Sequence, residues 1–424
     1  MSCKTSVVTG DVLSVLRGYP DNSFDGLLCD PPYGFSFMGK KWDYDVPSVD
    51  IWRECLRVLK PGALLLAFGG ARTQHRIATG IEDAGFELRD CLMWLYAKGF
   101  PKSQNISKAI DKAAGAERPV IGERTLTGNA AISTKEKGGT YGVQVGSVPA
   151  KIVPVTGPAT DEAKRWDGYG TALKPAYEPV ILARKPLEGT MVQNIRKWGT
   201  GGLAIDACRI ETDEKIPAHH GTNGGAGRTI GKFNDAYKPG DSGSVFNESG
   251  RWPANVLFDE AAAAYLDQVV GPRDSNPYRA NEADGAVLPL KKRSAGGTKQ
   301  RGLGPSRFFF SPKVSTKERE AGCEALEHRN VSEMLDREEG SDGLESPRSG
   351  ARNHHPTLKP IGLTEYLARL ILPPTACPVL LVPFSGAGSE MIGATQAGWP
   401  AIVGIEQDAS YVEIANARIA HWFK

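Results

Sequence analysis

The residues best suited to chemistry form the loop Asp30-Pro31-Pro32-Tyr33, which follows the apolar, strand-like run 24–29. Neither proline has an N–H, so the loop presents the Asp30 carboxylate and the Pro31 carbonyl as acceptors, and Tyr33 adds a flat ring. An exocyclic amino group has two N–H donors that these two acceptors could bind. The loop therefore predicts chemistry on a planar amine such as a nucleobase, although a strand-ending turn with Tyr33 in the core is an alternative interpretation.

A second candidate site is a turn of small residues, Phe384-Ser385-Gly386-Ala387-Gly388-Ser389. It lies between a strand expected at 379–382 and a helix expected at 390–397, so a ligand can approach the backbone and the helix N-terminus closely. The turn has neither the lysine of a phosphate loop nor the G-x-G-x-x-G spacing. Glu406 ends the next strand, where an acid typically binds ribose hydroxyls. This combination predicts a nucleoside cofactor without pyrophosphate, a description that S-adenosylmethionine (AdoMet) fits.

Alternating strands and helices must position both loops. In residues 5–100 we expect strands at 6–8, 24–29, 63–68 and 88–96, helices near 11, at 51–59 and at 73–84, and a turn at 60–62. The end of the chain repeats the pattern, with a helix at 361–371, strands at 379–382 and 401–405, and helices at 390–397 and 411–422. Continuous apolar strands separated by helices predict an α/β fold with a parallel sheet covered on both faces.

The middle of the chain is rich in glycine, proline and basic residues. A chain of 424 residues exceeds the size of one compact core, so either one large α/β domain with big insertions or two domains are expected. Within the middle of the chain we expect strands at 177–183 and 251–258 and a helix at 260–268. Two basic segments, Lys291-Lys292-Arg293 and 307–313, are candidates for phosphate contacts, although the Phe308-Phe309-Phe310 run in the second is more typical of a core.

Composition excludes some functions and leaves others open. A net charge of +2 is too small to argue nucleic-acid binding from bulk electrostatics. No apolar run approaches the roughly 20 residues of a membrane span, so no membrane partner is expected and the protein is most simply cytoplasmic. Most of the seven scattered cysteines lie in apolar runs, which predicts small core residues in a reducing compartment. His354 and His355 are adjacent without a nearby third ligand, so no metal is expected.

The order of the motifs resembles the β group of amino DNA methyltransferases, which modify adenine N6 or cytosine N4. The resemblance rests on Gly10-Asp11, Asp30-Pro31-Pro32-Tyr33, Glu178 in the segment 173–178, His355-Pro356-Thr357-Leu358-Lys359-Pro360, and Pro383-Phe384-Ser385-Gly386-Ala387-Gly388-Ser389. It implies a Rossmann-like, AdoMet-dependent methyltransferase sheet with a circularly permuted motif order and a large central insertion. The implied divisions are a catalytic half at 1–100, a DNA-contacting loop insertion at 101–170, a closing strand at 171–186, a target-recognition region at 187–353 and an AdoMet-binding half at 354–424.

The resemblance also implies roles for individual residues. Asp30, Pro31, Pro32 and Tyr33 would be catalytic, with Asp30 and the Pro31 carbonyl binding the target amino group and Tyr33 stacking on a flipped base. The cofactor would be bound by Asp11 at its adenine, Glu406 at its ribose, and Thr357 and Lys359 at its methionine end. The remaining cofactor-binding residues would be Asp30, Pro383, Phe384, Ser385, Gly386, Gly388 and Ser389.

Several of these roles have structural alternatives. Asp11 could be a helix N-cap, Lys359 a solvated charge, and Glu406 an acceptor for neighbouring backbone. Val382 stands where the family commonly has an aspartate before Pro-Phe, which removes a contact to the cofactor's ammonium group. Ser385, Ser389 or Asp30 could supply that contact instead. Phe35 and Trp42 could line a base pocket, but Trp42 is equally typical of a packing anchor.

The implied activity is site-specific methylation of adenine N6 in double-stranded DNA. Cytosine N4 fits the same acceptors. The loop begins with Asp30, whereas a serine at this position would favour cytosine, so the prediction favours adenine. RNA or protein is a further alternative substrate, although related loops then usually begin with asparagine. A non-catalytic DNA-binding protein with a decayed cofactor pocket is the last alternative, motivated by Val382. A homodimer and a cognate restriction endonuclease are partners that the resemblance leaves open.

Overall fold

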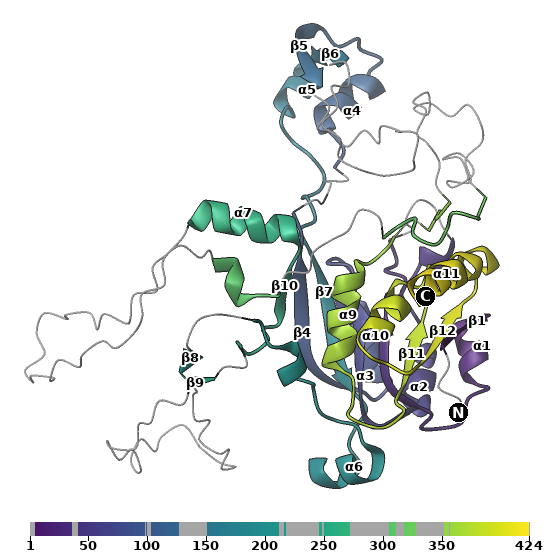
Figure 1. The fold of residues 1–424 in the computed structure, drawn as a ribbon. Coiled ribbons are helices and arrows are strands. Elements are labelled where there is room, and N and C mark those ends of the chain that lie inside the picture. The colour runs from purple at the N-terminus through teal and green to yellow at the C-terminus, as the bar shows by residue number, and fades with distance from the viewer. Residues whose placement is uncertain are drawn as a thin grey trace, which may run out of the picture.

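The computed structural model describes residues 5–35, 41–97, 99, 103–126, 151–211, 216–217, 246–247, 250–271, 305–310, 318–327, 352–355 and 357–423. Its main element is an eight-stranded sheet with the order β1-β12-β11-β2-β3-β7-β4-β10 (Figure 1). The strands are β1 (Thr5–Thr9), β2 (Phe24–Cys29), β3 (Leu59–Phe68), β4 (Glu87–Leu95), β7 (Tyr177–Arg184), β10 (Val256–Phe258), β11 (Val379–Pro383) and β12 (Ala401–Glu406). Neighbouring strands run parallel, except that β7 is antiparallel to both β3 and β4.

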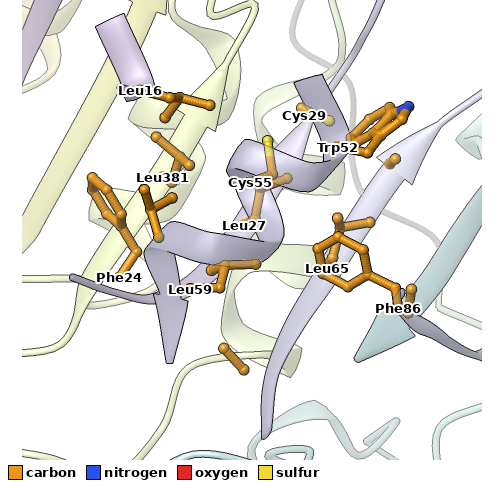
Figure 2. Close-up of a cluster of buried hydrophobic side chains, with 14 of the residues drawn as sticks. Leu16, Phe24, Leu27, Cys29, Trp52, Cys55, Leu59, Leu65, Phe86 and Leu381 are labelled. Carbon is orange, nitrogen blue, oxygen red and sulfur yellow. The ribbon is translucent and has the colours of Figure 1, made fainter. Parts of the chain in front are cut away.

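Helices bury both faces of the sheet. The helices α1 (Val12–Leu16), α2 (Val49–Val58) and α3 (Gln74–Asp83) pack on one face in the apolar cluster of Figure 2, where Leu27 and Cys29 of β2 contribute. On the other face, α9 (Ile361–Leu370) and α10 (Ser389–Gln396) pack over Leu28. Successive side chains of a strand point to opposite faces, so the continuous apolar runs are explained by burial on both sides. This doubly wound, Rossmann-like sheet confirms the predicted fold class.

Strands from the two ends of the chain pair with each other in the sheet. β1 pairs with β12, and Leu27 of β2 pairs with Leu381 of β11. From β11 the chain continues through α10 to β12 on one side, whereas from β2 it continues through α2 to β3 on the other. The final helix, α11 (Ala409–Trp422), lies against α10 and β1. The chain therefore reverses its winding between β2 and β11, which makes their carboxyl ends a topological switch point.

The segment between β4 and β7 is more ordered than the predicted loop insertion. Its described part forms a small lobe, which we call the α4–α5 lobe, apart from the main sheet in Figure 1. The lobe contains α4 (Ile106–Ala113), β5 (Val120–Leu126), β6 (Lys151–Thr156) and α5 (Asp161–Arg165). Buried Asp111 joins its parts, because its carboxylate accepts hydrogen bonds from Arg118 and from the N–H groups of Ala159 and Thr160. These short elements were not predicted, because the segment is rich in glycine and lysine.

Part of the segment 187–353 also belongs to the core. The helix α6 (Met191–Trp198) lies against β3, where buried Asn194 donates to the Pro61 carbonyl at 3.0 Å. The predicted turn at 60–62 is wrong, because β3 includes these residues and the Gly62 N–H donates to the Lys185 carbonyl. The predicted strand at 251–258 is reduced to β10, which is followed by α7 (Glu260–Val270).

The remaining elements are short. They are the 3-10 helices η2 (Lys41–Asp43), η3 (Asp206–Cys208) and η4 (Pro305–Phe308) and the strands β8 (Ile216–Pro217) and β9 (Phe246–Asn247). Phe310 stacks on Tyr366 of α9 with ring centroids 3.9 Å apart, and Phe309 packs edge-on against Phe258. The aromatic run thus serves the core at these two positions. The basic segment Lys291-Lys292-Arg293 lies outside the described residues.

The cysteines follow the prediction in part. Cys29, Cys55, Cys208 and Cys323 are buried and free, but Cys91 is exposed. Cys377 is exposed and disulfide-bonded, so the prediction that the cysteines are small core residues is wrong for it. In the described ranges, no helix has the length and apolar character needed to cross a membrane.

Candidate active site

Both candidate loops lie at the same edge of the sheet. Asp30 follows β2 and the glycine turn 384–388 follows β11, so the two loops meet at the switch point. They line one cavity of ≈ 1480 Å³ together with Asp11 and Glu406. Pockets for a single small ligand are typically about 300–1,000 Å³, so this cavity is large enough for two adjacent ligands.

Asp30 is held by side chains from distant parts of the chain. Its Oδ1 accepts a hydrogen bond from the Tyr33 hydroxyl at 2.7 Å, and its Oδ2 lies 2.6 Å from Lys359 Nζ. Glu178 of β7 contacts the same two partners, at 3.2 Å from the Tyr33 hydroxyl and 3.3 Å from Lys359 Nζ. The structure therefore brings together the Asp-Pro-Pro-Tyr loop, the segment before α9 and β7 in one charged network.

Lys359 is the cation of this network. Burial opposes its charge, but Asp30 and Glu178 outweigh that effect and raise the pKa of Lys359. Its Nζ also lies 4.8 Å from the ring centroid of Phe68 and 5.4 Å from that of Tyr33. Lys359 is 7% exposed, so the interpretation as a solvated charge is wrong. Burial, Asp30 and Glu178 raise the pKa of Tyr33 well above its usual value, so its hydroxyl remains a neutral donor.

The glycine turn is compact and is held by side chains of neighbouring segments. Gly386 and Gly388 have φ values of 48° and 78°, which glycine adopts without steric cost. A side chain at Gly386 would collide with the ring of His355, because an added Cβ would lie 2.6 Å from its Nε2. Arg418 of α11, which is 1% exposed, donates to the Ala387 carbonyl and to Ser389 Oγ. The turn is thus fixed between the segment before α9 and the last helix.

Asp11 and Glu406 have structural roles as well as positions in the cavity wall. Asp11 is the N-cap of α1, where its carboxylate accepts the Ser14 N–H at 2.9 Å. Glu406 accepts N–H groups from Gly386 at 3.0 Å and Asp408 at 2.9 Å. Each carboxylate oxygen can accept more than one hydrogen bond. Their roles towards adenine and ribose therefore stay predictions.

The other predicted residues divide into cavity wall and support. Pro31, Pro32, Phe384, Ser385, Gly386 and Ser389 line the cavity. Pro383 ends β11, and Gly388 is the N-cap of α10. Thr357 is exposed, and its carbonyl accepts a hydrogen bond from His355 Nδ1. Burial lowers the pKa of His355 to about 4, so its ring is neutral at pH 7.

The aromatic residues of the catalytic half also lie at the cavity. Phe35, Trp42, Trp94 and Tyr96 are in its wall, and Phe35 packs edge-on against Tyr33 at 5.9 Å between ring centroids. Aromatic faces are the surfaces on which an extruded base stacks. Trp42 therefore lines the cavity, and its role in a base pocket stays a prediction.

Sequence reasoning missed three residues that shape the site. Asp43 of η2, which is 2% exposed, accepts the N–H groups of Tyr33, Gly34 and Phe35 at 2.7, 3.0 and 3.2 Å. Arg418 supports the glycine turn, and Glu390, the second residue of α10, has its side chain in the cavity wall. A signal existed for Glu390, because it is an acid close after the glycines of the turn. Asp43 and Arg418 have no local signal, because the groups that they bind in the site belong to other segments.

Comparison with known proteins finds partial sequence similarity to type II methyltransferases. No protein-family model matches it. It is 29% identical over 122 residues to the type II beta methyltransferase M.BslI of Bacillus sp., 32% over 84 residues to the type II methyltransferase M.HindIII of Haemophilus influenzae, and 26% over 116 residues to M.HpaI of Haemophilus parainfluenzae. These matches cover 24%, 19% and 25% of this chain and 13%, 27% and 36% of the relatives' own lengths.

Two solved structures are similar along nearly the whole chain. M1.HpyAVI has a TM-score of 0.37 at 10% identity, with 98% of each chain covered. The cytosine-N4-specific PvuII DNA methyltransferase has a TM-score of 0.40 at 11% identity, with 99% of this chain and 87% of that chain covered. The fold assignment rests on this chain's own sheet order. The sequence matches confirm the resemblance to β-group amino-methyltransferases that the motifs predict.

Proposed function

We propose that this protein is an AdoMet-dependent, site-specific DNA methyltransferase that modifies the N6 amino group of a flipped adenine. The single observation that carries the proposal is the meeting of Asp30 and the glycine turn at the switch point, in one cavity with room for two ligands. One part of the cavity would bind the cofactor and the other the base. The sequence similarity to type II methyltransferases supports the same conclusion.

The cofactor part of the cavity has features that suit AdoMet. Ser385 Oγ is buried and has no hydrogen-bond partner among the described residues, so a polar donor or acceptor is available at the glycine turn. Three carboxylates, Asp30, Glu178 and Glu390, line the cavity beside Lys359, and such an acidic wall suits a ligand with a sulfonium and an ammonium group. AdoMet would supply an electrophilic methyl group there. Asp11, Glu406 and Thr357 lie in the same wall and would bind its other parts.

The base part of the cavity is formed by the catalytic loop and the aromatic residues. Asp30 and the Pro31 carbonyl would accept the two N–H groups of the target amine. Tyr33 and Lys359 would orient the Asp30 carboxylate, because they already bind one oxygen each. Tyr33 and its aromatic neighbours would stack on the extruded base. Asp30 at the first position of the loop favours adenine N6, and cytosine N4 is the alternative target.

Double-stranded DNA would be the partner of the two insertions. The α4–α5 lobe and the segment 187–353 would contact DNA, and Lys291, Lys292 and Arg293 would bind phosphates. A homodimer, a cognate restriction endonuclease and a cytoplasmic location belong to the same proposal. The basic triplet is tested by changing it to alanine, which should reduce the salt dependence of DNA binding by a slope of roughly 1 for each phosphate that the variant no longer neutralises. An unchanged slope would remove these residues from the DNA interface.

Transfer of a tritiated methyl group tests the substrate class. The protein is incubated with [methyl-³H]AdoMet and, in separate reactions, with unmethylated duplex DNA, total RNA or a cell protein extract. The proposal expects counts in DNA alone, and expects them to disappear in Asp30→Ala. Counts confined to RNA or protein, or an Asp30→Ala protein with full activity, would contradict the proposal.

A further inference from the structure

Glu390 is a buried carboxylate that the roles described above do not explain. It is the second residue of α10, directly after the glycine turn, and is 4% exposed. In the part of the chain that the structure describes, no lysine, arginine or histidine forms an ion pair with it. Burying a carboxylate without a cation is costly. A ligand that brings a positive charge would remove this cost.

The charges around Glu390 leave room for such a ligand. Lys359 forms ion pairs with Asp30 and Glu178, at 2.6 and 3.3 Å, but none with Glu390. Arg418, the other nearby cation, donates its hydrogen bonds to carbonyls and to Ser389 Oγ. Burial and the negative charge of Asp30 raise the pKa of Glu390 to about 7. The three carboxylates Asp30, Glu178 and Glu390 therefore outnumber the two nearby cations by one.

The position before Pro383, where the β group commonly has an acid, does not line the cavity. Val382 replaces the aspartate before Pro383-Phe384, and its side chain is fully buried in the apolar cluster beneath α9 and α10. It is not part of the cavity wall, whereas Glu390 is. Next to this turn, the carboxylate in the cavity wall therefore belongs to the helix after the turn and not to the strand before it.

We propose that Glu390 binds the α-ammonium group of the cofactor, in place of the missing acid at position 382. The inference rests on the proposed function, because it assumes an AdoMet-type ligand in this cavity. Among the alternatives, the charge of Asp30 is already neutralised by Lys359, and its carboxylate is assigned to the target amine in the proposed function. Ser389 Oγ accepts from Arg418. Ser385 has a free hydroxyl but no charge, so Glu390 is the acceptor best suited to an ammonium group.

The test compares two ligands by calorimetry on the purified full-length protein. S-adenosylhomocysteine carries the α-ammonium group, whereas 5′-methylthioadenosine lacks the whole amino-acid end. Loss of a charge-assisted hydrogen bond predicts that Glu390→Gln binds S-adenosylhomocysteine roughly 10- to 100-fold more weakly. Its affinity for 5′-methylthioadenosine should change less than about twofold. The matched control Glu413→Gln, which alters an exposed carboxylate on α11, should leave both affinities unchanged.

Each outcome is decisive. An equal loss for both ligands would show that Glu390 supports the turn structurally, and no loss for either would show that another group binds the ammonium; both overturn the inference while the proposed function stands. If wild-type protein binds neither ligand, the proposed function fails and this inference with it. Glu390→Asp, which keeps the charge, covers the case in which the glutamine variant does not fold. It should show the same ligand selectivity with a smaller loss, and an equal loss for both ligands would again overturn the inference.

Discussion

At the scale of single residues, the site is defined by how its charges are matched. Asp30 and Glu178 share Lys359, and Tyr33 donates to both carboxylates. The sequence predicted Asp30, Tyr33 and Lys359 through their motifs. The ion pair itself could not be predicted, because 329 positions separate Lys359 from Asp30.

Removing Lys359 should destabilise the protein in a pH-dependent manner. Lys359→Met leaves Asp30 and Glu178 without their cation, and we expect a loss of about 2 kcal/mol at pH 8. The raised pKa of Lys359 means that its contribution is complete below the unfolded value of 10.5 and is lost only as pH rises above it. The stability loss in the variant should therefore shrink as pH rises above 10.5. Chemical denaturation at pH 8 and pH 11 measures this change.

The control for this variant is Lys197→Met. Lys197 forms an exposed ion pair with Glu188, so its removal should cost less than about 1 kcal/mol at either pH. Equal effects of the two substitutions would show that the Lys359 network contributes no more than a surface pair.

Glu390 should reduce the stability of the ligand-free protein at neutral pH. Its pKa is raised to about 7 by burial and by Asp30, so folding favours its protonated form. The destabilisation is absent below the unfolded value of 4.5, grows as pH rises from 4.5 to about 7, and is complete above that. Glu390→Gln should therefore stabilise the ligand-free protein by up to about 3 kcal/mol at pH 8 and by almost nothing at pH 4.5. A glutamine variant that is less stable at pH 8 would contradict this account.

At the scale of elements, strands were easier to predict than their directions. Runs of apolar residues predicted β2, β11 and β12 within a residue or two of their bounds. The antiparallel direction of β7 depends on how the α4–α5 lobe returns the chain to the sheet, and no local pattern encodes that path. The small elements α4, α5 and α6 were missed, although Asn105, Thr160 and Thr190 are typical N-caps.

The element that fixes the Asp-Pro-Pro-Tyr loop is η2, through Asp43. Asp43→Ala removes the acceptor of three backbone N–H groups, which should cost about 1–3 kcal/mol of stability. Because Tyr33 and the cavity wall at Phe35 lose their anchor, we expect methyl transfer to fall more than about tenfold. The affinity for S-adenosylhomocysteine should change less than about twofold. Steady-state kinetics and calorimetry separate the two effects.

Asp50→Ala is the matched control for this prediction. Asp50 is an exposed residue of α2 outside the cavity, and its ion pair with Arg53 is on the surface. Its removal should leave turnover unchanged. If Asp43→Ala also retained full turnover, the anchoring of the loop by η2 would have no catalytic consequence.

At the scale of the whole molecule, the first and last strands of the chain pair within one open sheet, and other segments are inserted between strands. The α4–α5 lobe leaves and returns at one place, because Gln104 N–H donates to Thr171 and Thr171 N–H donates to Ser103, both at 2.9 Å. The lobe lies apart from the sheet in Figure 1. Its removal should therefore leave the core and the cofactor site intact.

Replacement of residues 106–168 by a short glycine-serine linker tests this division. We expect affinity for S-adenosylhomocysteine within about twofold of wild type, because a short linker costs little closure entropy. DNA binding should weaken and become less dependent on salt if the lobe contacts phosphates. Unchanged DNA binding would exclude the lobe from the interface, and loss of cofactor binding would show that it supports the core.

The identity of the nucleoside that the protein modifies decides between the proposed activity and its alternatives. Duplex DNA from a methylation-deficient host is incubated with AdoMet and protein, digested to nucleosides and analysed by mass spectrometry. We expect N6-methyladenine with wild-type protein and with Asp83→Asn, an exposed carboxylate of α3, and none with Asp30→Asn. N4-methylcytosine would change the target but keep the acceptor site. Full methylation by Asp30→Asn, or no methylated base with wild-type protein, would contradict the proposed mechanism.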